Sequence, residues 1–170
     1  PLIFEPWEFR DEDLNLDECV KKGIKVYGTD ESDSRLKTMS YIGYIVLYHL
    51  LNEKRSPFSV NRILLLANAK FGNPITEILN KNGYIVDFIS EYDAPVELSH
   101  YDILITAEHQ NDKLLIGEQG YLEPELFDSK MLVLHISGKV EVDQLQCKVI
   151  PKDPASFGYM SYSTDFIDSK

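Results

Sequence analysis

Cysteine is nearly absent from this 170-residue sequence, which contains only Cys19 and Cys147. The two residues lie far apart and have no histidine close to them in sequence. They therefore provide neither a disulfide framework nor the ligand spacing of a zinc site. We expect a reduced, cytoplasmic setting and no bound metal.

Long apolar runs and basic clusters are missing as well. The longest apolar run, residues 41–51, includes Gly43 and His49 and is too short to cross a bilayer, and no signal peptide is visible. The net charge is −11 and the pI is near 4.7, without a cluster of Lys and Arg. These features argue against nucleic acid and membranes as partners. Because residue 1 is Pro rather than Met, we expect the chain to be a piece of a longer protein.

The stretch of residues 62–89 has the pattern of a strand, a helix and a second strand. Residues 63–67 are apolar throughout, which is typical of a strand covered on both faces. Ile75, Ile78 and Leu79 then recur at helical spacing, Gly83 ends the helix, and residues 84–89 resume a strand-like run. This order predicts a βαβ unit.

The rest of the chain alternates between the same two kinds of pattern. We predict helices over residues 17–22, 35–52 and 124–127, one or two helical turns over 142–146, and strands over 24–28, 101–107, 131–136 and 148–151. This alternation predicts an α/β, Rossmann-like doubly wound fold: a mainly parallel sheet with helices on both faces. The length and the hydrophobic content of 44% favour a single domain over residues 1–170, with peripheral segments at 1–16 and 152–170.

The turn of the βαβ unit lies where dinucleotide-binding chains carry GxGxxG. Here it reads Ala67-Asn68-Ala69-Lys70-Phe71-Gly72, so alanine stands at the first two glycine positions. Gly72 preserves the close packing of helix and strand, whereas the methyl group of Ala69 lies where a pyrophosphate would approach the backbone. Asn73-Pro74 is also an ordinary helix start, with a capping side chain and a proline at the first helical position. Two interpretations stay open: a fold whose phosphate site has decayed, and a site still used by NAD or another nucleotide.

A cofactor would also need a residue that binds its ribose. Glu91 follows the second strand and is a candidate to hold the ribose hydroxyls, although we favour the interpretation that it is a solvated loop acid. Lys70 is a candidate phosphate contact or a solvated side chain, and the acids favour NAD over NADP. The candidate cofactor-binding residues are Ala67, Ala69, Lys70, Phe71, Gly72, Asn73, Glu91 and Ala107.

Several segments, in collinear order from about residue 14 to residue 146, resemble the nucleotide-binding domain of the D-isomer-specific 2-hydroxyacid dehydrogenases. Residues 16–27 are similar to the segment that leads into that domain, and residues 35–51 to the long helix after it. Residues 114–118 resemble a short stretch after the fourth strand, and residues 131–140 resemble the strand and turn that carry the catalytic arginine. The resemblance implies an NAD-binding Rossmann domain that forms a dimer.

The sequence departs from this family at the positions that carry its chemistry. Ser137 stands where the family has its substrate-binding arginine, and a hydroxyl cannot grip a carboxylate as a guanidinium does. The family's acid is a histidine further along the chain, and no histidine follows His135. The family also binds substrate between two domains, and this chain supplies only the nucleotide half. We therefore assign no catalytic residue, and we expect all four histidines to be structural or solvated.

The leading hypothesis is a diverged, non-catalytic domain related to the 2-hydroxyacid dehydrogenases, with at best weak NAD binding. It would form a homodimer through the helix of residues 35–52, whose broad apolarity requires more than one covered face. One alternative is an active NAD-dependent oxidoreductase, acting on a 2-hydroxy acid, that is completed by a missing region or a second subunit. Another is a protein-interaction module on a Rossmann scaffold.

Overall fold

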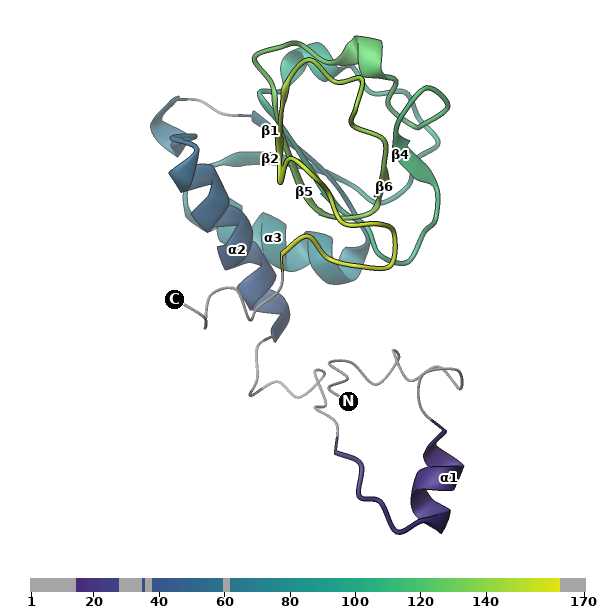
Figure 1. Ribbon diagram of the computed structural model, residues 1–170. Helices are drawn as coiled ribbons and strands as arrows, with labels where there is room; N and C mark the ends of the chain where they lie inside the picture. The colour runs from purple at the N-terminus through teal and green to yellow at the C-terminus, as the bar shows by residue number, and fades with distance from the viewer. Residues whose placement is uncertain (1–14, 28–34, 36–37, 60–61, 163–170) are drawn as a thin grey trace. The chain divides into compact units, whose positions relative to one another are not determined.

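The computed structural model describes residues 15–27, 35, 38–59 and 62–162 (Figure 1). The chain divides into two compact units, residues 1–38 and 39–170. The prediction of one domain with peripheral segments at 1–16 and 152–170 therefore stays a prediction. Within the described residues, no helix combines the length and the apolar character that a membrane span needs.

The first unit contains one described helix, α1 (Leu16–Lys21), which confirms the helix predicted at 17–22. Asn15 caps it by accepting a hydrogen bond from the Glu18 amide at 3.0 Å. The strand predicted over 24–28 is wrong in its described part: residues 24–27 are irregular and exposed. Alternation alone does not make a strand, because a strand also needs a neighbour to bond, and no described residue pairs with this segment. Gly28 lies outside the described residues.

The second unit is built on a five-stranded sheet in which all strands run parallel. In space the strands follow the order β2-β1-β3-β5-β7. They are β1 (Arg62–Ala67), β2 (Ile85–Ile89), β3 (Ile103–Ala107), β5 (Leu132–Ser137) and β7 (Lys148–Ile150). The predicted βαβ unit and the α/β, Rossmann-like class are confirmed.

The strand order creates a topological switch point between β1 and β3. From β1 the chain moves to one side to form β2 and then returns to the other side to form β3. The loops after β1 and β3 therefore leave the sheet in opposite directions and open a crevice at the carboxyl ends of these strands. Open α/β sheets bind their ligands at such a point.

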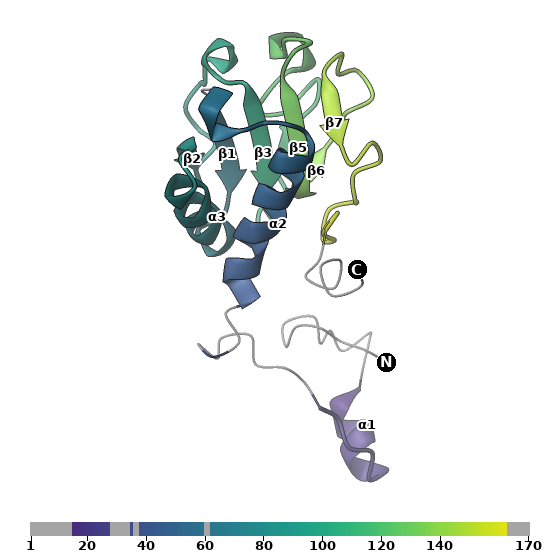
Figure 2. The same ribbon diagram turned by 90° about the vertical axis from the view of Figure 1, so that its left-hand side faces the viewer.

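Both described α-helices of this unit cover one face of the sheet (Figure 2). They are α2 (Thr38–Asn52) and α3 (Ala69–Lys81). Helix α2 confirms the helix predicted at 35–52 over residues 38–52, whereas residue 35 lies in a turn. The apolar side chains of both helices pack on alternate residues of β1, β3 and β5. The core on this face includes Ile42, Ile45, Val46, Leu50, Phe71, Ile75, Leu79, Ile63, Leu65, Ile103, Ile105, Leu132 and Leu134.

The opposite face is covered by 3-10 turns, loops and a second, two-stranded parallel sheet. That sheet pairs β4 (Leu114–Ile116) with β6 (Lys139–Val140), and the turns are η3 (Leu98–His100) and η4 (Pro124–Leu126). A further 3-10 turn, η2 (Pro57–Ser59), precedes β1. The helix predicted at 124–127 is thus only a single 3-10 turn. Of the one or two helical turns predicted at 142–146, the structure has a single hydrogen-bonded turn and no helix; the Leu145 amide closes this turn on the Val142 carbonyl at 3.0 Å.

Helix α2 lies against α3 at Gly43. A Cβ atom added there would lie 2.7 Å from Ile78 Cγ1 and 2.8 Å from the carbonyl oxygen of Pro74. Since one of these neighbours is backbone, the crowding cannot be relieved by a rotamer change.

We predict that Gly43→Ala destabilises the domain. Overpacking costs about 1–3 kcal/mol, and the better helix propensity of alanine returns only about 1 kcal/mol. Urea unfolding should therefore give a lower free energy of unfolding for this variant. Ser40→Ala in the same helix is the control and should change stability by less than about 0.5 kcal/mol. A Gly43→Ala protein as stable as the parent would contradict the close contact of the two helices.

Candidate functional site

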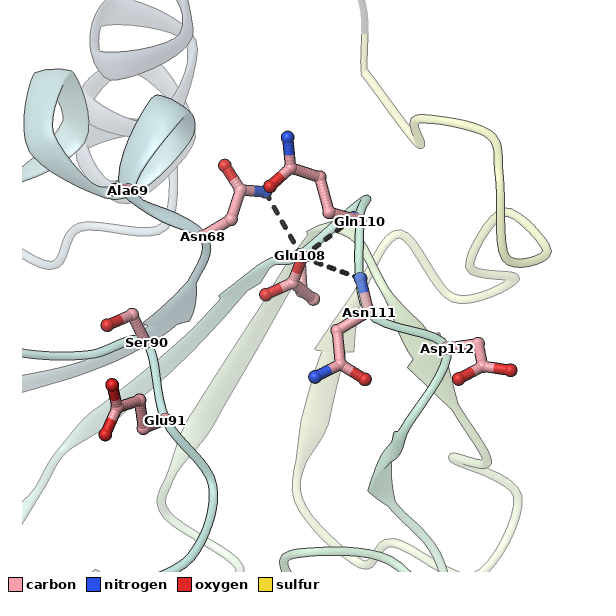
Figure 3. A pocket seen from close by; sticks show the side chains of 8 residues that line it. All are labelled: Asn68, Ala69, Ser90, Glu91, Glu108, Gln110, Asn111 and Asp112. Carbon is pink, nitrogen blue, oxygen red and sulfur yellow. Dashed lines mark hydrogen bonds between the residues drawn. The ribbon is translucent and has the colours of Figure 1, made fainter.

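A pocket of about 490 Å³ opens at the switch point (Figure 3). It lies at the carboxyl ends of the strands, among the turn that starts α3, the residues that follow β2 and the loop that follows β3. The lining residues are Asn68, Ala69, Ser90, Glu91, Glu108, Gln110, Asn111 and Asp112.

The turn between β1 and α3 consists of one residue, Asn68. Its Oδ1 accepts a hydrogen bond from the Phe71 amide at 3.2 Å, and its carbonyl accepts one from the Gly72 amide at 2.8 Å. The helix therefore begins at Ala69. The predicted start at Asn73-Pro74 is wrong, because Asn68 already caps the chain and Pro74 lies inside the helix.

Gly72 lies against the second strand of the βαβ unit. A Cβ atom added to it would fall 2.2 Å from the ring of Phe88 in β2. This is the close packing of helix and strand that the sequence predicts for the third glycine position.

Glu108 follows β3 directly and is only 2% exposed. Its Oε1 accepts hydrogen bonds from the amides of Gln110 at 2.8 Å and Asn111 at 3.1 Å, and from Asn68 Nδ2 at 3.3 Å. Its Oε2 accepts one from the hydroxyl of Tyr92 at 2.8 Å. One carboxylate thus joins the turn after β1, the segment after β2 and the loop after β3.

These hydrogen bonds keep Glu108 negatively charged. Burial by itself raises the pKa of a carboxyl group, but the donors from Gln110, Tyr92, Asn111 and Asn68 outweigh it and lower the pKa of Glu108 below its ordinary value. Burial and the hydrogen bond to Glu108 raise the pKa of Tyr92, so that its hydroxyl stays a donor. The pocket therefore contains a fixed negative charge at neutral pH.

His109 also stabilises the turn between β1 and α3, through contacts with Asn68 and Phe71. Its Nδ1 accepts a hydrogen bond from Asn68 Nδ2 at 2.6 Å, and its ring stacks on Phe71 with the ring centroids 4.2 Å apart. Burial, assisted by the charge of Lys70, lowers the pKa of His109 despite the neighbouring Glu108. The imidazole is therefore neutral at neutral pH, as its acceptor role requires.

The segment after β2 is also tied down. The Lys113 ammonium donates a hydrogen bond to the Tyr92 carbonyl and lies 3.8 Å from Asp93 Oδ1. The Tyr121 hydroxyl donates to the carbonyl of Ala94 at 2.6 Å. The walls of the pocket are thus held by hydrogen bonds between loops.

The structure separates the predicted cofactor-binding residues into two groups. Ala69 and Glu91 line the pocket. The others do not line it. Of these, Ala67, Phe71, Gly72 and Ala107 are buried in the sheet and helix packing, Lys70 is half-buried, and Asn73 is exposed on α3.

Glu108 and most of the polar lining residues were not predicted as site residues. Their positions in the sequence could have indicated this role, because polar residues that directly follow two buried parallel strands meet at one edge of the sheet. The lining contains three acids, Glu91, Glu108 and Asp112, and neither Lys nor Arg. In the described part of the chain, no group of three or more His, Cys, Asp and Glu side chains is arranged to hold a metal ion.

Ser137, the residue at the position of the family's arginine, lies at the end of β5 and is 1% exposed. Its hydroxyl has no hydrogen-bond partner among the described residues, and it does not line the pocket. It therefore presents no charge to a substrate carboxylate.

Comparison of the chain with protein-family models, with curated proteins and with solved structures gives no match.

We predict that Glu108→Gln lowers stability at neutral pH by about 1–3 kcal/mol, because buried donors lose a charged acceptor. The pKa of Glu108 is lowered on folding, so its contribution is complete above the ordinary glutamate value of 4.5 and is lost as the pH falls through the folded value. The stability difference between parent and variant should therefore shrink as the pH drops from about 6 to about 3.

Chemical denaturation over this pH range measures the effect. Glu125→Gln, at an exposed carboxylate in η4, is the control and should leave the pH dependence unchanged. A stability difference that stays constant with pH would contradict an ionised Glu108.

Proposed function

We propose that this chain is a diverged Rossmann domain of the NAD(P)-binding type, related to the D-isomer-specific 2-hydroxyacid dehydrogenases. It does not transfer hydride, and it binds NAD weakly at best. The observation that carries the proposal is the buried, ionised Glu108 at the switch point, hydrogen-bonded to the turn on which a pyrophosphate would lie.

The charge of this carboxylate opposes a diphosphate. Like unit charges about 4 Å apart repel by about 4 kcal/mol at the effective dielectric constant of ~20 that describes protein sites. The pocket lining supplies no Lys or Arg to offset this repulsion, and it adds Glu91 and Asp112. Repulsion of its phosphates would therefore cost a dinucleotide much of the binding free energy that its other groups contribute.

The turn also offers fewer donors than a glycine-rich turn. The Phe71 amide is already bonded to Asn68, and both amide hydrogens of Asn68 are directed to Glu108 and His109. The methyl group of Ala69 occupies part of the space that the second glycine leaves open. The N-terminus of α3 therefore presents fewer hydrogen-bond donors to an anion than a helix N-terminus normally does.

We further propose a homodimer that forms through α2. Tyr41, Tyr44, Tyr48 and Leu51 are each 40% or more exposed and recur at intervals of three and four residues on one side of the helix. Such spacing is that of a seam between two helices. A second copy of the chain, presenting the same seam, would cover it.

We also propose that the protein works in a reducing compartment such as the cytoplasm. Cys19 and Cys147 are both free thiols, as is usual there.

Isothermal titration with NADH tests the nucleotide proposal. We expect a dissociation constant weaker than about 1 mM, and no tighter binding of NADPH, ATP or S-adenosylmethionine. A low-micromolar constant for NADH would instead support the alternative of an active oxidoreductase that a missing region or a second subunit completes.

The cause of weak binding can be tested separately. If the charge of Glu108 repels the diphosphate, Glu108→Gln should bind NADH about tenfold more tightly than the parent, which corresponds to about 1.4 kcal/mol. Glu125→Gln, which removes the same charge away from the pocket, should have no effect. Equal affinities for the two variants would contradict the role assigned to Glu108.

For the dimer, we predict that the double variant Tyr41→Glu, Tyr44→Glu is monomeric, since it places charges in the seam. Light scattering after gel filtration measures the mass. Tyr159→Glu, at a tyrosine that is 67% exposed outside α2, should leave the dimer intact. A parent protein that is monomeric at micromolar concentration would refute the proposal.

A further inference from the structure

A serine and a histidine meet at the carboxyl end of β5, apart from the lining of the pocket. The Oγ of Ser161 lies 2.7 Å from Nδ1 of His135, and Nε2 of His135 lies 3.0 Å from the carbonyl oxygen of Gly138. The Ser161 amide also donates a hydrogen bond to the Ile136 carbonyl at 2.7 Å. The backbone therefore holds the serine beside the strand that carries the histidine.

The partners of His135 determine which of its nitrogens carries the proton. A carbonyl oxygen only accepts, so Nε2 must carry the hydrogen that bonds Gly138. In the neutral ring Nδ1 then has a free lone pair, and the Ser161 hydroxyl donates to it. His135 is completely buried, and burial lowers its pKa, so the ring is neutral at neutral pH.

The Ser161 oxygen receives a hydrogen bond as well. The Ala155 amide donates to Oγ at 2.9 Å. The hydroxyl is thus polarised from both sides: its proton is directed at a base, and its oxygen faces a donor that favours a negative charge. Ser161 is partly exposed, whereas the base behind it is not.

We propose that Ser161 is a nucleophile that is activated by His135 and accepts an acyl group from an ester. The Gly138 carbonyl orients the base, the role that a carboxylate fills in a Ser-His-Asp triad. The inference goes beyond the proposed function, which involves neither residue.

The reaction balances with water as the only co-reactant. Oγ attacks the carbonyl carbon, its proton moves to Nδ1, and the bond between the acyl carbon and the leaving alkoxide breaks as the alkoxide takes that proton. Water then attacks the acyl-serine with Nδ1 as base, which releases a carboxylic acid and restores the hydroxyl.

The same hydrogen bonds also fasten residues 155–161 to β5, so a loss of stability in a variant would not separate a structural from a chemical role. The test therefore measures reactivity. A fluorophosphonate probe is incubated with the folded chain, and the adduct is mapped by mass spectrometry of peptides. We expect labelling at Ser161 that is lost in Ser161→Ala and kept in Ser156→Ala, where the serine is exposed and five residues away. Folded parent protein without an adduct at Ser161 would overturn the proposal.

A second measurement does not depend on removing the side chain. In Ser161→Cys the imidazole of His135 should favour the thiolate, so the pH midpoint of alkylation by iodoacetamide at this residue should fall at least about one unit below that of Ser156→Cys, which should lie near the ordinary cysteine value of about 8.5. The midpoint of a rate profile does not depend on how accessible the sulfur is. A midpoint for residue 161 at or above that for residue 156 would overturn the proposal.

Discussion

One buried negative charge holds the carboxyl end of this sheet together. Three loops that leave β1, β2 and β3 carry their own backbone polar groups into a crowded region, and Glu108 accepts hydrogen bonds from all three. A buried carboxylate is costly unless it is paired or hydrogen-bonded, so the loops and the charge stabilise each other. The same carboxylate that joins the loops of the crevice is the group that, in our proposal, repels a phosphate.

Much of the fold could be predicted from the sequence because local pattern and tertiary packing agree there. Residues 63–67 are apolar at every position, and β1 is indeed covered on both faces. The segments at 24–28 and 142–146 show the limit of the same reasoning. Short patterns do not reveal whether a neighbouring strand or helix is present to complete them.

The candidate site could be predicted only in part. Ala69 and Glu91 follow from their spacing in the βαβ unit, and they do line the pocket. The hydrogen bonds from Asn68 and Tyr92 to Glu108, and from Asn68 to His109, join residues 16 to 41 positions apart in the chain, and no local periodicity encodes such pairs. The meeting of His135 and Ser161 is of the same kind, since the two residues come from a strand and a loop separated by 26 positions.

The place of β2 at the margin of the sheet has a consequence for solubility. An outermost strand presents free amides and carbonyls on which another molecule can add a strand of its own. β2 is short and carries Asp87 near its centre, where Arg62 Nη2 lies 3.0 Å from its carboxylate. Charges on an edge strand discourage the edge-to-edge pairing of sheets that leads to aggregation. Because an exposed ion pair adds little to the free energy of folding, this pair contributes more to preventing aggregation than to stability.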